Sequence, residues 1–92
     1  MGRRLWEVSW SYPALHALRE LPMRDAEKVD RAVLLFARTG EGQVERVSGA
    51  PTGLWLKAPP YTLRLSLDAS DHVVVVWWVG RAGSSHKPTP KR

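Results

Sequence analysis

Residues 73–79, with the sequence VVVVWWV, form an unbroken apolar run that leads into Gly80 and Arg81. A strand with one face in water alternates apolar and polar side chains, and this segment does not alternate. The run therefore predicts a central strand that packs on helices on one face and is covered, or binds a partner, on the other. A chain of 92 residues is large enough for a single small domain around such a strand.

The segments before this run change from a strand period to a helical period and back. Apolar residues alternate at the start of the chain, whereas between Pro13 and Gly40 they recur every three or four residues. We therefore expect an α+β fold in which an N-terminal strand precedes a two-helix hairpin on one face of a twisted antiparallel sheet. The expected elements are strands at 5–10, 43–47, 54–57, 62–67 and 73–79 and helices at 12–21 and 24–39.

The formal net charge of +5 is concentrated near the C-terminus. Residues 81–92 contain four basic residues and no acidic one, so the rest of the chain is nearly neutral. We expect a single domain at 1–81 followed by a flexible basic tail at 82–92. Such an asymmetry favours a polyanionic partner, often nucleic acid, although a tail that only keeps the protein soluble would carry the same charge.

Several classes of protein are disfavoured by composition. The chain contains no cysteine, which excludes a disulfide framework and a cysteine-based zinc site. Its histidines and carboxylates lack the spacing of metal ligands, so we expect no metal and no cofactor. The N-terminal residues have neither the apolar run of a signal peptide nor the length of a membrane span. These observations predict a soluble, cytoplasmic protein without a membrane partner.

Side-chain alternation divides the predicted hairpin at 54–67 into two faces. Its leucines point to the core, whereas Trp55 and Lys57 point outward. In this register Trp55 faces Arg64 and Lys57 faces Thr62, so a guanidinium is expected to lie against an indole.

The register can be carried into the last strand across a two-residue loop at 69–70, which pairs Arg64 with Val75 and Thr62 with Trp77. The outer face is then expected to carry Val73, Val75, Trp77 and Val79 and to continue toward Arg81, and the inner face His72, Val74, Val76 and Trp78. Cations interleaved with aromatic residues suit a phosphate backbone and stacked bases. Alternatively, the long basic side chains only shield an exposed sheet with their stems.

Short motifs along the chain add a resemblance to a known family. They are V-x-W (Val8, Trp10), L-P (Leu21, Pro22), R-V-x-G (Arg46, Val47, Gly49), L-x-L-K (Leu54, Leu56, Lys57), a Y-x-L-x-L strand and V-G-R (Val79, Gly80, Arg81). In this order the motifs resemble the RelE/ParE family of bacterial toxins, from about Trp6 to Arg81.

The resemblance implies a toxin that is held inactive by a cognate antitoxin. RelE-type members cleave mRNA in the ribosomal decoding site, and ParE-type members poison DNA gyrase. In the cleaving branch the 2′-hydroxyl of the substrate attacks the adjacent phosphorus, and the protein supplies a base, an acid and cations but no metal.

The family's site residues match this chain only in part. Lys57 falls at the second lysine of a K-x-K pair, whose first lysine is replaced by Trp55. Thr62 replaces the arginine of Y-R-L, and Arg64 on the same face is a substitute for it. The resemblance thus implies four catalytic candidates: Lys57, Arg64, Arg81 near the late arginine, and His86 near the terminal tyrosine or histidine.

Further site residues follow from the predicted outer face and the tail. We expect Trp55, Trp77 and Lys87 to contact nucleic acid. We expect an antitoxin segment, or the tail itself, to cover the apolar row of Val73, Val75 and Trp77. Three functions remain open: a ribosome-dependent mRNA endonuclease, a gyrase-binding toxin without nuclease activity, and a non-toxic binding module with the same fold.

Overall fold

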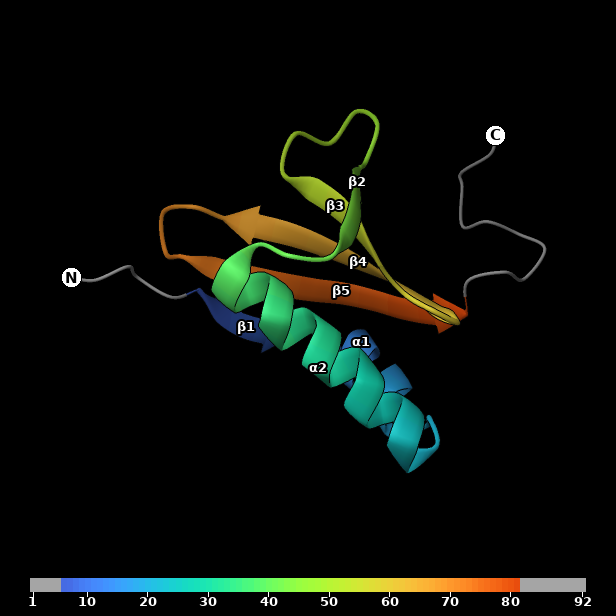
Figure 1. Ribbon diagram of the computed structural model, residues 1–92. Helices are drawn as coiled ribbons and strands as arrows, with labels where there is room; N and C mark the ends of the chain where they lie inside the picture. Colours follow the sequence, from blue (N-terminus) through green and yellow to red (C-terminus); the bar gives the residue numbers. More distant parts are fainter. Residues whose placement is uncertain (1–5, 82–92) are drawn as a thin grey trace.

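The computed structural model describes residues 6–81 and shows two helices packed on one face of a five-stranded sheet (Figure 1). The order of the elements is the predicted one, and their bounds differ from the expected ones by a few residues. In chain order they are β1 (Glu7–Trp10), α1 (Tyr12–Arg19), α2 (Met23–Thr39), β2 (Gln43–Arg46), β3 (Gly53–Ala58), β4 (Tyr61–Asp68) and β5 (Val73–Arg81).

The sheet has the strand order β1-β5-β4-β3-β2, so the apolar strand β5 is an interior strand between β1 and β4. The middle position itself belongs to β4. Strands β2 to β5 pair antiparallel, as expected, whereas β1 pairs parallel with β5 and makes the sheet mixed. A parallel pair needs a long crossover, and the segment from α1 to β4 provides it.

Local signals in the sequence set the limits of both helices. The Ser11 hydroxyl accepts a hydrogen bond from the Ala14 amide at 3.2 Å and caps α1. Gly40 ends α2 in the left-handed conformation, with φ of +79°, and its amide donates to the Phe36 carbonyl. Between these ends, α2 buries Val29, Val33 and Ala37 on the side that faces the sheet.

The core lies between the helices and the inner face of the sheet, and within residues 6–81 it contains no buried polar or charged residue. Both helices and all the strands except β2 contribute side chains to it. The largest fully buried side chains are Leu56, Leu63, Leu65, Val29, Val33, Val74 and Val76. This face therefore stabilises the fold by apolar burial and close packing.

The register between β4 and β5 differs from the predicted one in two ways. The turn has four residues, 69–72, because Asp68 pairs with Val73. A β-bulge then leaves Trp77 without an opposite residue, so that Arg64 pairs with Trp78 and not with Val75. The bulge reverses the faces of all the residues that follow it.

Candidate functional site

The helices leave the other face of the sheet open, and a row of three side chains crosses β3, β4 and β5 there. Trp55 pairs with Arg64, as predicted, and Arg64 pairs with Trp78. The Arg64 Cζ lies 5.5 Å from the centroid of the Trp55 ring, a cation–π distance. The two indoles meet edge to face, with centroids 6.2 Å apart at 85°. A guanidinium is thus held beside two aromatic rings.

The surroundings of Arg64 hold its guanidinium close to the sheet. Its Nε is buried and has no hydrogen-bond partner within the described residues. A Cβ on Gly53 would lie 3.1 Å from the nearest terminal nitrogen of Arg64, so the absence of a side chain at Gly53 leaves room for the guanidinium. The Trp55 indole and the close packing at Gly53 therefore hold the positive charge in place.

Trp77 and Trp78 both lie on the open face, because the bulge places two successive side chains on one side. Trp77 is 51% exposed and donates a hydrogen bond from Nε1 to the Ser66 hydroxyl at 2.8 Å, and Trp78 is 38% exposed. The Trp78 ring lies over Gly80, where a Cβ would overlap it. The predicted outward position of Trp77 is correct, and the predicted inward position of Trp78 is wrong.

Lys57 lies on the open face opposite Thr62, as predicted, but it has an acidic neighbour. Its Nζ is 3.4 Å from the Glu45 carboxylate, and both side chains are exposed. A salt bridge in water contributes less than about 1 kcal/mol, so an incoming phosphate could displace it at low cost. Sequence reasoning missed Glu45, although alternation along 43–47 places it on the same face as Trp55.

Arg81 does not lie on the open face with Lys57 and Arg64, which corrects its expected position at the end of the outer face. It pairs with Tyr61, and its Cζ lies 5.6 Å from the centroid of the Tyr61 ring. Tyr61 belongs to the helix-covered side, where its hydroxyl donates to the Asp25 carboxylate at 2.7 Å. The bulge is the physical reason, since it also turns Val79 inward, where only 7% of it is exposed.

The contact with Asp25 changes the acidity of Tyr61. The hydrogen bond to Asp25, burial and the negative charge of that carboxylate all raise the pKa of Tyr61 above its usual 10.0, while the nearby Arg81 lowers it. Tyr61 is 4% exposed. This phenol therefore stays protonated at neutral pH and joins the start of β4 to α2.

The remaining predicted residues lie elsewhere. Val73 and Val75 are half-buried on the open face, as expected. His72 is in the β4–β5 turn with φ of +56°, and its ring contacts that of Trp6, with centroids 4.8 Å apart and the planes tilted by 42°. His86 and Lys87 lie outside the described residues.

Residues 6–81 contain neither a metal-binding cluster nor a membrane-spanning helix. No group of three His, Asp or Glu side chains there could hold a metal ion. No helix of this part of the chain is long and apolar enough to cross a membrane.

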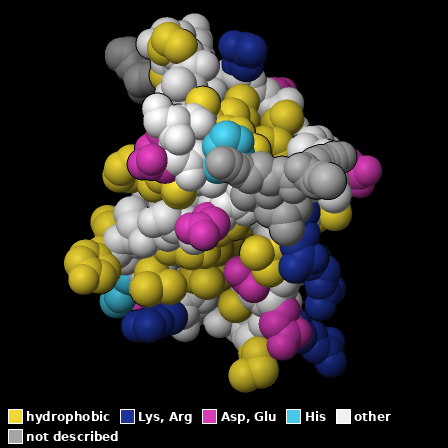
Figure 2. Space-filling view, turned by 90° about the vertical axis from the view of Figure 1, so that its left-hand side faces the viewer, with side chains coloured by type: hydrophobic (Ala, Val, Ile, Leu, Met, Phe, Trp, Pro, Cys, Tyr) yellow, Lys and Arg dark blue, Asp and Glu magenta, His cyan; other side chains and the backbone are white. Residues whose placement is uncertain are grey.

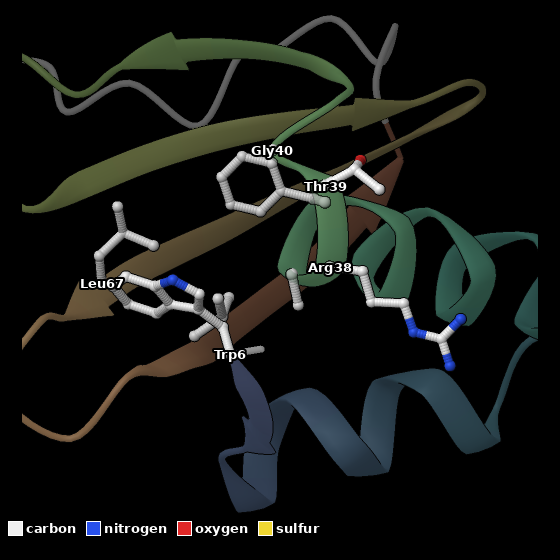
Figure 3. A pocket seen from close by; sticks show the side chains of 8 residues that line it. Trp6, Arg38, Thr39, Gly40 and Leu67 are labelled. Carbon is white, nitrogen blue, oxygen red and sulfur yellow. The ribbon is translucent and has the colours of Figure 1, made fainter. Parts of the chain in front are cut away.

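An open hollow of about 360 Å³ lies away from the tryptophan row, at the C-terminal end of α2 (Figure 3). Trp6 and Leu67 line it together with Phe36 and Val74, and the Arg38 side chain points away from Trp6. The hollow is mainly apolar and contains no catalytic pair, so the open face remains the candidate site.

No protein-family model matches the sequence, and no curated protein sequence matches it significantly. Solved structures do match. The isolated RelE toxin of E. coli superposes with a TM-score of 0.75 at 21% identity, covering 87% of each chain. The toxin–antitoxin complex RelBE2 of Mycobacterium tuberculosis gives 0.75 at 17%, covering 87% of this chain and 94% of that one. The archaeal RelE–RelB complex of Pyrococcus horikoshii gives 0.76 at 14%, covering 89% and 100%.

The chain has the RelE fold. The likeness covers 87–100% of the length of these RelE chains, so it extends over both the helices and the sheet. At such low identity the RelE fold does not transfer side-chain roles, and fold alone does not determine function. A function must therefore be inferred from the side chains that this chain carries on its open face.

Proposed function

We propose that this chain is the toxin of a toxin–antitoxin pair and that its open sheet face binds single-stranded RNA. The observation that carries the proposal is Arg64, held beside Trp55 and Trp78 on the sheet face that the helices of this RelE fold leave open. Exposed indoles next to a fixed guanidinium suit stacked bases and a phosphate backbone.

The parts of the RNA would contact different side chains. Trp77 and Trp78 are the most exposed aromatic residues of the face and offer stacking surfaces to bases, each worth about 1–3 kcal/mol. Arg64 and Lys57 are the cations within reach of the phosphates. Lys87 would extend this contact along the RNA, and Trp55 would orient Arg64.

The reaction that fits this face is cleavage of mRNA on the ribosome. The 2′-hydroxyl oxygen bonds to the adjacent phosphorus as the bond to the 5′-oxygen breaks; one proton leaves the hydroxyl and another reaches the leaving oxygen. Lys57 and Arg64 would stabilise the charge on the phosphorane. We assign the proton transfer to His86, whose ordinary pKa lies near neutrality.

A second function, inhibition of a target such as gyrase without cleavage, is favoured by a specific observation. Within the described residues the open face carries only two cations, one of them paired with Glu45, while Arg81 lies on the other side. Such a face would bind RNA or protein without cleaving RNA.

The antitoxin is expected on the same face. Val73, Val75 and Trp77 form its apolar row, and covering apolar surface contributes about 25 cal/mol per Å². An antitoxin segment over this row would also shield Arg64 and so block access of RNA to it.

The deciding experiment is inducible expression in a bacterium, with mapping of mRNA 5′ ends and measurement of gyrase supercoiling. New 5′ ends support the nuclease, a loss of supercoiling supports the second function, and growth without either effect contradicts both. Single-turnover cleavage of ribosome-bound mRNA then tests the residues. Arg64→Ala should slow it about 10²-fold, or about 3 kcal/mol, whereas Arg81→Ala should slow it much less.

A further inference from the structure

The outward surface of α2 combines exposed leucines with exposed arginines. Leu34 is 39% and Leu35 is 45% exposed. Arg24, Arg31 and Arg38 are exposed and make no hydrogen bond or ion pair within residues 6–81. Side chains of this kind usually cover a surface or contact another molecule.

Helical spacing brings these residues onto one side of α2. Positions three, four and seven residues apart lie on the same face, so both leucines neighbour Arg31 and Arg38. Arg31 and Arg38 are separated by roughly 10 Å along the axis, at 1.5 Å per residue. We name this surface the α2 patch; it comprises Arg24, Lys28, Arg31, Leu34, Leu35 and Arg38.

The acids of α2 leave the patch mainly basic. Asp25 is turned to Tyr61, and Asp30 is half-buried. Glu27 is an exposed acid on the same face, three residues from Arg24 and four from Arg31, so this surface carries four basic residues and one acidic residue. Lys28 donates to the Pro59 carbonyl at 3.3 Å. In Figure 2, Lys and Arg side chains line the lower right-hand edge of the molecule, with Asp and Glu side chains next to them.

We propose that the α2 patch binds an acidic amphipathic helix of a protein partner. Its leucines would pack against apolar residues of that helix, and its arginines would pair with the flanking carboxylates. An apolar centre with a charged rim rich in arginine is the usual composition of such an interface.

A nucleic acid explains less of this surface. Phosphates would pair with the arginines, but the two leucines between them would remain exposed to water. The open face lies on the opposite side of the sheet from α2, so both surfaces can be occupied together (Figure 1). The inference therefore stands whether or not the open face binds RNA.

The test uses the full chain and a synthetic 21-residue helical peptide with a leucine stripe flanked by glutamates. Titration calorimetry near physiological salt measures its affinity, and amide chemical shifts of the wild-type protein locate it. Arg31→Glu with Arg38→Glu should weaken binding at least tenfold, and Leu35→Ser should also weaken it. The matched control, Arg19→Glu with Arg46→Glu, has the same net charge at exposed sites elsewhere and should bind like wild type.

Shifts confined to α2 and the loss in the patch variants together support the proposal. An equal loss in the control pair means unspecific charge attraction and overturns it, as do shifts elsewhere on the molecule. Titration of a short RNA duplex is the third arm. If the patch variants lose RNA binding but keep the peptide, the surface binds nucleic acid and the proposal is wrong.

Discussion

The two faces of the sheet are built from the same strands with opposite chemistry. On the helix-covered face, β3, β4 and β5 contribute fully buried leucines and valines, and no polar residue is buried there within residues 6–81. On the open face, the neighbouring positions carry Trp55, Arg64 and Trp78 in one row. The comparison shows that alternation along a strand separates residues that stabilise the fold from residues free to bind.

Within strand β5, the alternation between buried and open positions shifts by one residue. Up to Val76 the buried and open positions alternate. The bulge at Trp77 then puts two tryptophans on the open face and moves Val79 and Arg81 to the other side. One additional residue thus enlarges the aromatic surface and removes a cation from it.

The largest expected effect is on the covered face. Leu63→Ala should lower the free energy of unfolding by about 2–5 kcal/mol, because it removes a fully buried side chain and leaves a cavity. Its neighbour Thr62, which points to the open face, is the matched control, and Thr62→Ala should cost less than about 1 kcal/mol. Urea denaturation measures both; similar losses would contradict the assignment of the two faces.

A smaller effect is expected where the bulge positions Trp78. Gly80→Ala should destabilise the protein by about 1–3 kcal/mol, because the new methyl group overlaps the indole and displaces it. In a Trp78→Ala background the same change should cost only a few tenths of a kcal/mol. The four proteins of this cycle are compared by urea denaturation, and equal costs in both backgrounds would mean that the ring does not lie over Gly80.

Much of the fold could be predicted from local patterns. The helices followed from the apolar spacing between Pro13 and Gly40, and Gly40 is the residue that ends α2. The faces of β3 and β4 followed from alternation, which correctly paired Trp55 with Arg64. The predicted two-residue loop was too short by two residues, but a shift of two leaves every side chain on its face, so Val73 and Val75 were placed correctly.

The errors have a different physical origin. A bulge shifts the register by one residue, and nothing in a run of valines and tryptophans marks where it falls, since both faces of that strand are apolar. Trp78 and Arg81 were therefore assigned to the wrong faces. The parallel pairing of β1 with β5 depends on the direction in which the chain returns to the sheet after the crossover. The apolar periodicity of the sequence does not reveal that direction.

The smallest expected effect concerns Tyr61, which joins the covered face to α2, and it appears as a dependence of stability on pH. Because the hydrogen bond to Asp25 raises the pKa of Tyr61, the folded state holds the phenolic proton more tightly than the unfolded chain. This stabilisation is fully present below the usual pKa of 10.0 and is lost as pH rises through the raised value. The free energy of unfolding should thus fall more steeply above about pH 10 in wild type than in Tyr61→Phe, which keeps the ring beside Arg81.

Urea denaturation between pH 8 and 11 measures the difference between the two proteins, and lysines that titrate in both cancel from it. Parallel curves would show that the phenol does not hold its proton through Asp25.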